Sequence, residues 1–166
     1  MKMIRLSKSV VGLEEVDALR RIILEDGYLG MGQEVKAFEE DLHNFLGGKA
    51  HVTCVNSGTA ALHLAVMAVV KPGQEVLVPS LTFVGSFQAI SGAGAVPVAC
   101  DVDPDTLLLD LDDARLRLTA KTKAIMPVHY SGGVGNLKAI YAFARKYKLR
   151  VIEDAAHAFG TVYQGK

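Results

Sequence analysis

The sequence is short of the features that tie a protein to nucleic acid, to a membrane or to secretion. Its 18 basic and 18 acidic residues cancel, so the formal net charge is zero and gives no electrostatic attraction to a phosphate backbone or an anionic membrane surface. The longest apolar stretch, residues 60–70, contains His63 and is too short to span a bilayer. The first ten residues have no continuous apolar segment of the secretory type. We therefore expect a cytoplasmic protein with neither nucleic acid nor membrane as a partner.

Cysteine is also scarce, with Cys54 and Cys100 as the only two residues of this type. Each lies in an apolar run, and neither has the CxxC or Cys/His spacing of a metal or redox site. We interpret both as reduced thiols in a protein core and expect no metal site. With 166 residues, half of them apolar, the chain can bury a core without disulfide or metal staples, which predicts a soluble globular protein.

Residues 1–48 are predicted to form an N-terminal helical segment. Apolar residues recur there at helical spacing in two stretches. They are Leu13, Val16, Leu19, Ile22 and Ile23 in the first stretch, and Val35, Phe38, Leu42, Phe45 and Leu46 in the second. The glycine-rich loop at residues 27–32 separates the two predicted helices.

From His51 onward the pattern changes to short β-branched runs that alternate with helical stretches. We expect strands at about residues 51–55, 75–78, 95–101, 122–127 and 150–153, and helices at about 58–70, 83–91, 112–118 and 137–147. This order predicts an α/β fold for residues 49–166, with three layers in which helices flank a mostly parallel sheet.

Four of the predicted strands end in unusual residues, and ligands of parallel α/β sheets gather at this edge. The segments are residues 56–59, 79–83, 127–130 and 153–157. In the first, Ser57, Gly58 and Thr59 stand between a strand and an apolar helix. The unpaired backbone N–H groups and the positive end of the helix dipole would form an anion site there, most naturally for a phosphate. Ordinary N-capping by serine or threonine is the alternative.

Asp154 and His157 are candidates at the last of these strand ends. Alternation along the strand puts Ile152 and Asp154 on one face, and a buried carboxylate there needs a partner. That partner is either the following turn, which Asp154 would cap, or a cation held in a dry pocket, such as a protonated heterocycle. His157 could point into the same pocket or serve as an ordinary structural donor.

Phe83 and His129 also follow strands. Phe83 could lie against a planar ring or be a core aromatic at the start of a helix, and His129 is equally ambiguous. A phosphate cradle, an aromatic side chain that faces a ring and a buried carboxylate for a ring nitrogen are together the parts that pyridoxal phosphate needs.

Several spaced motifs resemble the N-terminal half of the DegT/StrS-type sugar aminotransferases, which are fold type I pyridoxal-phosphate enzymes. In order, they are GYLGMGQ at 27–33, the helix with FE at 38–39, NSGTAAL at 56–62, EVLVPSLTF at 75–83, DVD at 101–103, PVH at 127–129 and EDAAHAFG at 153–160. The resemblance covers essentially the whole chain and implies that residues 49–166 form part of the cofactor-binding large domain. It also implies transamination of a nucleotide-linked keto sugar, an amino-acid donor that is usually glutamate, and active sites at the interface of a homodimer.

The matching motifs imply how the cofactor would be held. Gly58 and Thr59, together with Ser57, would bind its phosphate, and Phe83 would stack on its pyridine ring.

The same resemblance assigns the two polar groups of the ring to the last motif. Asp154 would pair with the ring nitrogen, and His157 would bond the phenolic oxygen. An anionic Asp154 would keep that nitrogen protonated, so that the ring accepts electron density when a proton leaves the substrate carbon.

The sequence departs from the family pattern in two places. The residues that follow His129 differ from the small-residue turn that the family commonly has, so no substrate role is assigned to Tyr130. The Schiff-base lysine has no counterpart, because Lys166 does not match its motif. That lysine holds the cofactor aldehyde and moves the proton, so we expect the 166 residues alone to be inactive and to self-associate through uncovered apolar surface.

Two alternatives remain open. A sugar dehydratase of the same family uses the same cofactor pocket but replaces the lysine, and only the segment that carries the lysine separates the two activities. A non-catalytic α/β module that binds a phosphorylated small molecule would keep the pocket without the reaction.

Overall fold

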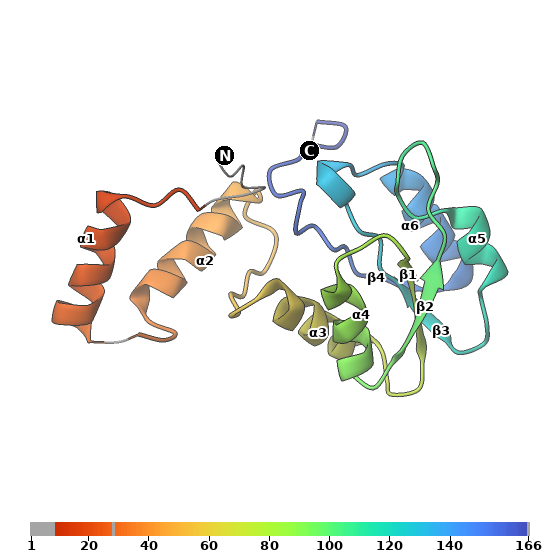
Figure 1. The fold of residues 1–166 in the computed structure, drawn as a ribbon, viewed down its shortest axis with the longest axis horizontal. Coiled ribbons are helices and arrows are strands. Elements are labelled where there is room, and N and C mark those ends of the chain that lie inside the picture. Colours follow the sequence, from red (N-terminus) through yellow and green to blue (C-terminus); the bar gives the residue numbers. More distant parts are fainter. Residues whose placement is uncertain (1–8, 28, 166) are drawn as a thin grey trace, which may run out of the picture. The chain divides into compact units, whose positions relative to one another are not determined.

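The computed structural model describes residues 9–27 and 29–165, and the chain divides between Cys54 and Val55 into two compact units (Figure 1). We call the part up to Cys54 unit 1 and the part from Val55 unit 2. Each is described by itself.

Unit 1 is helical. Its elements are α1 (Leu13–Arg21), a π-helical turn η1 (Ile22–Asp26) that continues α1, and α2 (Gln33–Phe45). Gly27 ends η1 at a φ of +63°, a left-handed conformation that glycine adopts without steric cost. The two predicted helices are confirmed. None of the residues of these three elements is buried, and apolar side chains such as Leu19 and Phe38 are more than half exposed.

Unit 2 is built on a parallel sheet. Its strands are β1 (Glu75–Pro79), β2 (Val96–Cys100), β3 (Thr122–Ile125) and β4 (Arg150–Val151), in the spatial order β2-β1-β3-β4. Its helices are α3 (Gly58–Val69), α4 (Val84–Gly92), α5 (Leu111–Leu116) and α6 (Leu137–Tyr147), with a 3-10 turn η2 (Tyr130–Gly132). The predicted α/β class with parallel strands is confirmed. Among the described residues, no helix has the length and apolar character needed to cross a membrane.

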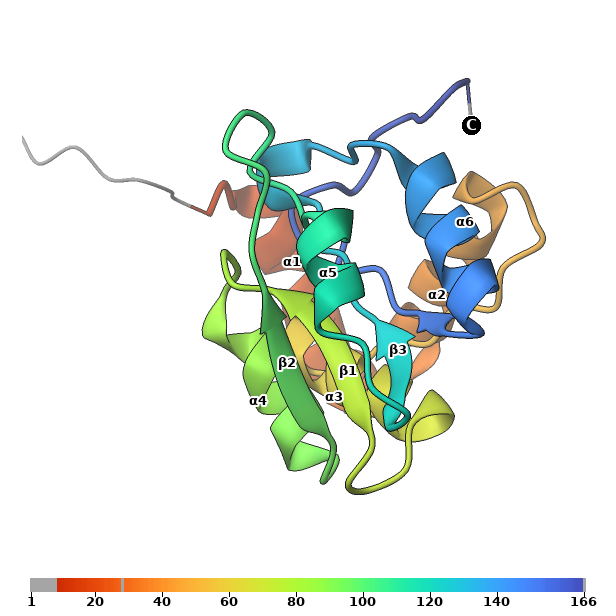
Figure 2. The same cartoon turned by 90° about the vertical axis from the view of Figure 1, so that its right-hand side faces the viewer.

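The core of unit 2 consists of two apolar clusters, one on each face of the sheet. The helices α3 and α4 cover one face, and α5 and α6 cover the other (Figure 2). Val76 and Val78 of β1 pack on the side of α3 and α4, together with Ile90. Leu77, which lies between them in the strand, packs on the opposite side with Ala144 of α6. Both faces of the sheet are therefore covered by helices, as the predicted three layers require, and each large apolar side chain buried in this way contributes about 1.5–3 kcal/mol.

The edge strand β2 contains a proline. The N–H of Val96 donates to the carbonyl of Gln74 at 2.8 Å, so the backbone groups of Val96 point toward β1 and those of Pro97 point away from it. Proline has no N–H to donate, and at this outward position no hydrogen bond of the sheet is lost. The proline is tolerated because β2 lies at the edge.

The strand predicted at residues 51–55 is wrong, because this segment has no strand conformation. The N–H of Cys54 donates instead to the carboxylate of Glu39 on α2, at 2.6 Å. A β-branched run becomes a strand only where a neighbouring strand can pair with it, and the described residues of unit 1 include none. Cys54 is accordingly half-buried rather than in a core. Cys100 is buried, and burial raises the pKa of its thiol to about 11.

Candidate functional site

Asp154 is fixed at the carboxyl edge of the sheet by the ends of β3 and β4. Both strands end earlier than predicted, but their pairing resumes beyond them as an isolated parallel bridge between Val128 and Asp154. The N–H of Asp154 donates to the carbonyl of Pro127 at 2.9 Å, and its own carbonyl accepts from the N–H of His129 at 3.0 Å. Because both the N–H and the carbonyl of Asp154 are bonded to the segment that continues β3, the position of its side chain is well defined.

The Asp154 carboxylate is buried, with the residue only 7% exposed, and it is bonded to neutral donors. Ser86 Oγ of α4 donates to Oδ2 at 2.9 Å, and the N–H of Ala156 donates to Oδ1 at 3.2 Å, so Asp154 does cap the following turn. Within residues 9–27 and 29–165, no arginine, lysine or histidine forms an ion pair with it. A buried carboxylate without a cation is costly. The site therefore suits a ligand that brings a protonated nitrogen.

The face that Asp154 occupies agrees with the predicted alternation. Ile152 packs in the cluster on the side of α3 and α4, and the carboxylate of Asp154 meets Ser86 of α4 on the same side.

Ser86 and Thr82 extend the hydrogen-bond network of Asp154, and neither is among the candidate residues predicted from the sequence. Thr82 Oγ1 lies 2.8 Å from Ser86 Oγ, which in turn bonds Asp154. Ser86 is buried in the first turn of α4, among apolar and small residues. Ser86 lies at helical spacing from the buried Ala89 and Ile90, and a hydroxyl on that face of the helix is the signal that could have pointed to it.

Gly85 brings Thr59 and Phe83 together. A Cβ at position 85 would lie 2.7 Å from Thr59 Oγ1 and 2.9 Å from Cδ1 of the Phe83 ring, which is closer than side-chain atoms can approach. The first turns of α3 and α4 therefore meet at this glycine. Phe83 itself is 73% exposed, so it is not a core aromatic and its ring is open to a ligand.

Ser57 is the N-cap of α3, and its Oγ accepts the N–H of Ala60 at 3.1 Å, as the capping alternative predicts. The N–H groups of Gly58 and Thr59 receive no hydrogen-bond acceptor from the described residues. Gly58 is exposed, and a Cβ built there meets nothing within 4 Å. Two free N–H groups at the positive end of a helix of 12 residues are a suitable place for an anion.

His157 lies against the loop that follows β3. Its Nδ1 accepts the N–H of Ser131 at 3.3 Å, and its ring meets the ring of Tyr130 edge-on at 5.9 Å between centroids. Because Nδ1 is an acceptor, a neutral His157 carries its hydrogen on Nε2 and presents a donor there. The structure records no bond between the side chains of His157 and Asp154 among the described residues.

Glu153 and His129 form a separate network on the side of α6. The Nε2–H of buried His129 donates to Glu153 Oε2 at 2.7 Å, and the hydroxyl of Tyr141 on α6 donates to Glu153 Oε1. The bond from His129 holds the pKa of Glu153 below its usual value, and burial, followed by the bond to Glu153, raises the pKa of Tyr141 to about 12. His129 thus ties the ends of β3 and β4 together on the face opposite to Asp154.

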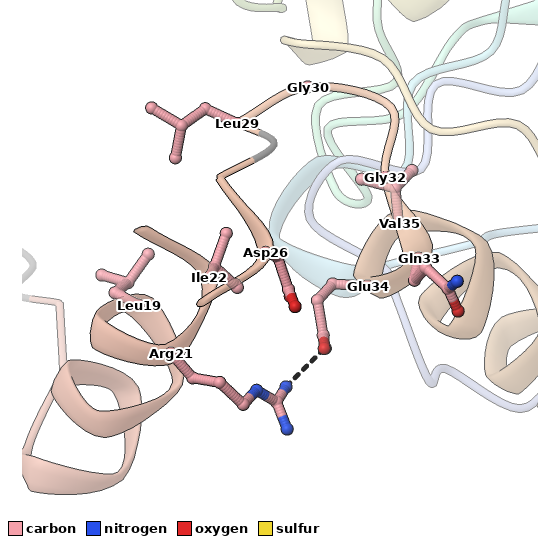
Figure 3. A pocket seen from close by; sticks show the side chains of 10 residues that line it. All are labelled: Leu19, Arg21, Ile22, Asp26, Leu29, Gly30, Gly32, Gln33, Glu34 and Val35. Carbon is pink, nitrogen blue, oxygen red and sulfur yellow. Dashed lines mark hydrogen bonds and ion pairs between the residues drawn. The ribbon is translucent and has the colours of Figure 1, made fainter. Parts of the chain in front are cut away.

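Unit 1 contains a cavity of about 630 Å³ that is distinct from these groups (Figure 3). It is lined by residues of α1, η1, the glycine loop and the start of α2, and an ion pair between Arg21 and Glu34 lies at it. Gly30 and Gly32 of the GYLGMGQ motif take part in the lining, while Tyr28 of the same motif lies outside the described residues. None of the predicted site residues lines this cavity.

Comparison with solved structures shows what unit 1 and unit 2 together are similar to. DesV from S. venezuelae, solved in complex with a ketimine intermediate, matches with 35% identity over 93% of this chain and a TM-score of 0.85. 3-Amino-5-hydroxybenzoic acid synthase matches with 38% identity over 95% of this chain and a TM-score of 0.86. The putative sugar aminotransferase Spr1654 from Streptococcus pneumoniae, in its PMP form, matches with 29% identity over 98% of this chain and a TM-score of 0.91.

The chain spans 42%, 41% and 44% of the lengths of these three proteins. The model of the DegT/DnrJ/EryC1/StrS aminotransferase family matches residues 11–166. The motif resemblance is therefore confirmed over nearly the whole sequence, and the chain belongs to the DegT/DnrJ/EryC1/StrS aminotransferase family.

Proposed function

We propose that this chain forms the N-terminal part of a pyridoxal-phosphate-dependent aminotransferase, and that unit 2 binds the cofactor at the carboxyl edge of its sheet. The observation that carries the proposal is Asp154, a buried carboxylate to which the described residues supply no cation. The pyridine nitrogen of the cofactor, when protonated, is such a cation. Spr1654, which has been solved in PLP and PMP forms, supports this choice of ligand.

The remaining groups fit the other parts of the cofactor. The free N–H groups of Gly58 and Thr59 at the start of α3, next to the N-cap Ser57, suit its phosphate. Phe83 offers an exposed ring that can stack on the pyridine. The Nε2–H that the bond from Ser131 imposes on His157 is a donor for the phenolic oxygen. All of these residues belong to the predicted α/β segment, residues 49–166.

The chemistry follows from how these side chains act together. Pyridoxal phosphate, when bound, supplies an electron-accepting ring that stabilises negative charge at the substrate carbon. Asp154 holds a proton at the ring nitrogen and so increases the electron demand of the ring. Phe83 would cover one face of the ring, and His157 would fix the orientation of the ring by donating to the phenolic oxygen.

None of the described lysines of unit 2 is proposed as the lysine that moves the proton in transamination. The described lysines of unit 2 precede β1, stand at the start of β3, or belong to α6 and its end; they are Lys71, Lys121, Lys123, Lys138, Lys146 and Lys148. The helix α6 packs on the face opposite to Asp154. We therefore expect residues 1–166 by themselves to bind the cofactor without turnover.

For the substrates, we propose a nucleotide-linked keto sugar as amino acceptor and an amino acid, glutamate first, as donor. The name of Spr1654 as a putative sugar aminotransferase supports this acceptor. The match to a synthase named for 3-amino-5-hydroxybenzoic acid makes the precursor of an amino-substituted ring acid the second acceptor to test beside the sugar. We also propose a homodimer, supported by apolar residues such as Leu64 and Met67 of α3, which are more than half exposed.

Titration with pyridoxamine phosphate tests the cofactor site, because this amine form does not condense with surface lysines. Asp154→Asn is expected to weaken binding roughly 30-fold or more, about 2 kcal/mol, since a neutral amide replaces the charge that pairs with the ring nitrogen. Asp105→Asn, at an exposed aspartate between β2 and α5, is the matched control and is expected to bind as the unchanged protein does. No binding by the unchanged protein, or equal binding by Asp154→Asn, would contradict the proposal.

A further inference from the structure

Ser86 stands in the middle of a chain of hydroxyl groups that ends on Asp154. Thr82 Oγ1 lies 2.8 Å from Ser86 Oγ, and Ser86 Oγ lies 2.9 Å from Asp154 Oδ2. Ser86 is 1% exposed and Thr82 is half-buried. This row of hydrogen-bonded groups therefore runs from the loop after β1, through α4, to the segment that follows β4. Most of it is shielded from water.

The chemistry of these groups fixes the direction of the bonds. An ionised carboxylate has no hydrogen to give, so Ser86 donates its one hydroxyl hydrogen to Asp154. The Ser86 oxygen can then only accept from its other neighbour, which makes Thr82 the donor to Ser86. Both hydroxyl dipoles point toward the carboxylate, and bonds that run in one direction onto a charged acceptor strengthen one another.

We propose that Ser86, supported by Thr82, is a positioning residue that holds the Asp154 carboxylate in the orientation needed at the ring nitrogen of the cofactor. This inference rests on the proposed function, because Asp154 meets that nitrogen only when the cofactor occupies the site. Without Ser86, the carboxylate keeps its bond from Ala156 on Oδ1 and loses the bond that fixes Oδ2. With one of its two side-chain hydrogen bonds gone, it turns about the Cβ–Cγ bond more easily and would meet a bound ring in a less defined orientation.

The position of Ser86 in the helix strengthens the argument. The preceding residue, Gly85, is the point where α4 meets Thr59 and the ring of Phe83. One turn at the start of α4 therefore contacts a residue proposed for the phosphate, the residue proposed for the ring face and the carboxylate proposed for the ring nitrogen. A shift of Ser86 relative to Asp154 therefore changes the distances between Asp154, Thr59 and Phe83.

Affinity for pyridoxamine phosphate is the first measurement. Ser86→Ala is expected to weaken binding roughly tenfold or more, as loss of a hydrogen bond to a charged group does. Thr82→Val, which keeps the shape of the side chain, is expected to weaken it a few-fold. Ser91→Ala, at an exposed serine in the last turn of the same helix, is the control and is expected to have no effect.

Ser86→Cys separates hydrogen bonding from packing. The thiol fills almost the same space as the hydroxyl but is a weak donor, so this variant is expected to bind nearly as weakly as Ser86→Ala. If Ser86→Cys binds like the unchanged protein while Ser86→Ala does not, Ser86 only fills space and the proposal is overturned. Because the cysteine and valine variants conserve volume, they test the proposal even where Ser86→Ala fails to fold.

The second measurement is nitrogen-15 NMR of pyridoxamine phosphate labelled in its ring. The ring nitrogen is expected to show the protonated shift in the unchanged protein and to move toward the unprotonated shift in Ser86→Ala, a change that a purely structural role would not produce. If the unchanged protein binds the cofactor and the Ser86 variants match it in affinity and in this shift, the positioning role fails alone. If the unchanged protein does not bind pyridoxamine phosphate at all, both the proposed function and the positioning role of Ser86 are contradicted.

Discussion

Glu153 and Asp154 are neighbours in the chain, yet their carboxylates lie on opposite faces of the sheet and meet opposite surroundings. Glu153 faces α6, where His129 and Tyr141 both donate to it. Asp154 faces α4, where its donors are the hydroxyl of Ser86 and one backbone N–H. Glu153 therefore has an ion-pair partner in His129 within the protein, whereas Asp154 is buried with no cation among the described residues.

This difference separates a carboxylate that supports the fold from one that awaits a ligand. An acid whose hydrogen-bond donors all come from the protein itself links elements of structure, as partly exposed Glu153 does through His129 and Tyr141. A buried acid left without a positive partner costs stability, and such a cost is typical of functional sites. The two side chains can be distinguished experimentally because the same chemical change, from acid to amide, should act in opposite ways on them.

The largest expected effect is on stability in the absence of cofactor. Glu153→Gln is expected to lower the free energy of unfolding by roughly 1–2 kcal/mol, because buried His129 loses its charged acceptor. Asp154→Asn is expected to leave the protein equally stable or more stable, because it removes a buried charge that lacks a cation. Urea unfolding of the two variants measures both effects. An equal loss in both variants would remove the distinction between the two carboxylates.

The pH dependence of the free energy of unfolding tests the contribution of ionised Glu153 separately. The bond from His129 keeps the pKa of Glu153 below its ordinary value of 4.5 in the folded protein. A lowered folded-state pKa means that ionised Glu153 stabilises the fold above the ordinary value, and that this contribution disappears as the pH falls through the lowered value. The difference in unfolding free energy between the unchanged protein and Glu153→Gln is therefore expected to shrink as the pH falls below 4.5 and through the lowered pKa. A difference that stays constant over this range would argue against the bond.

The smallest expected effect concerns Tyr141. Burial and the bond to Glu153 raise its pKa from 10 to about 12, so its contribution to stability is present below pH 10 and is lost as the pH rises toward 12. Absorbance titration of the tyrosines is expected to show a late-titrating phenol that disappears in Tyr141→Phe and titrates earlier in Glu153→Gln. Titration curves that Tyr141→Phe leaves unchanged near that pH would contradict this assignment.

Elements with strong local signals are predictable from the sequence. The helix predicted at residues 137–147 has the observed bounds, because Asn136 caps it through the N–H of Ala139 at 3.0 Å and Lys148 ends it in a left-handed conformation. The apolar run at residues 75–78 is recognisable because β1 is buried on both faces. The run at residues 51–55 looks similar, but the part of the chain that the structure describes places no strand beside it. A single segment of sequence does not reveal whether a partner strand is present.

The candidate site is predictable where it depends on periodicity or motifs and not where it depends on distant contacts. The period of two places Asp154 with Ile152 on one face, as the structure has them. The bond from Ser86 to Asp154 joins residues 68 positions apart, and no local pattern encodes it. The tautomer of His157 depends on Ser131, whose φ of +54° is uncommon for serine and is not signalled by the sequence.

The proline in the edge strand β2 affects how copies of this chain can meet. A parallel sheet with an open edge offers N–H and carbonyl groups along which another strand can add, and this is a common origin of aggregation. At Pro97 the outward position has no N–H to offer. Growth of the sheet from one copy into the next is thereby hindered at β2. At this edge, the proposed contact between copies would therefore use a helix surface, such as that of α3 with the exposed Leu64 and Met67, rather than added strands.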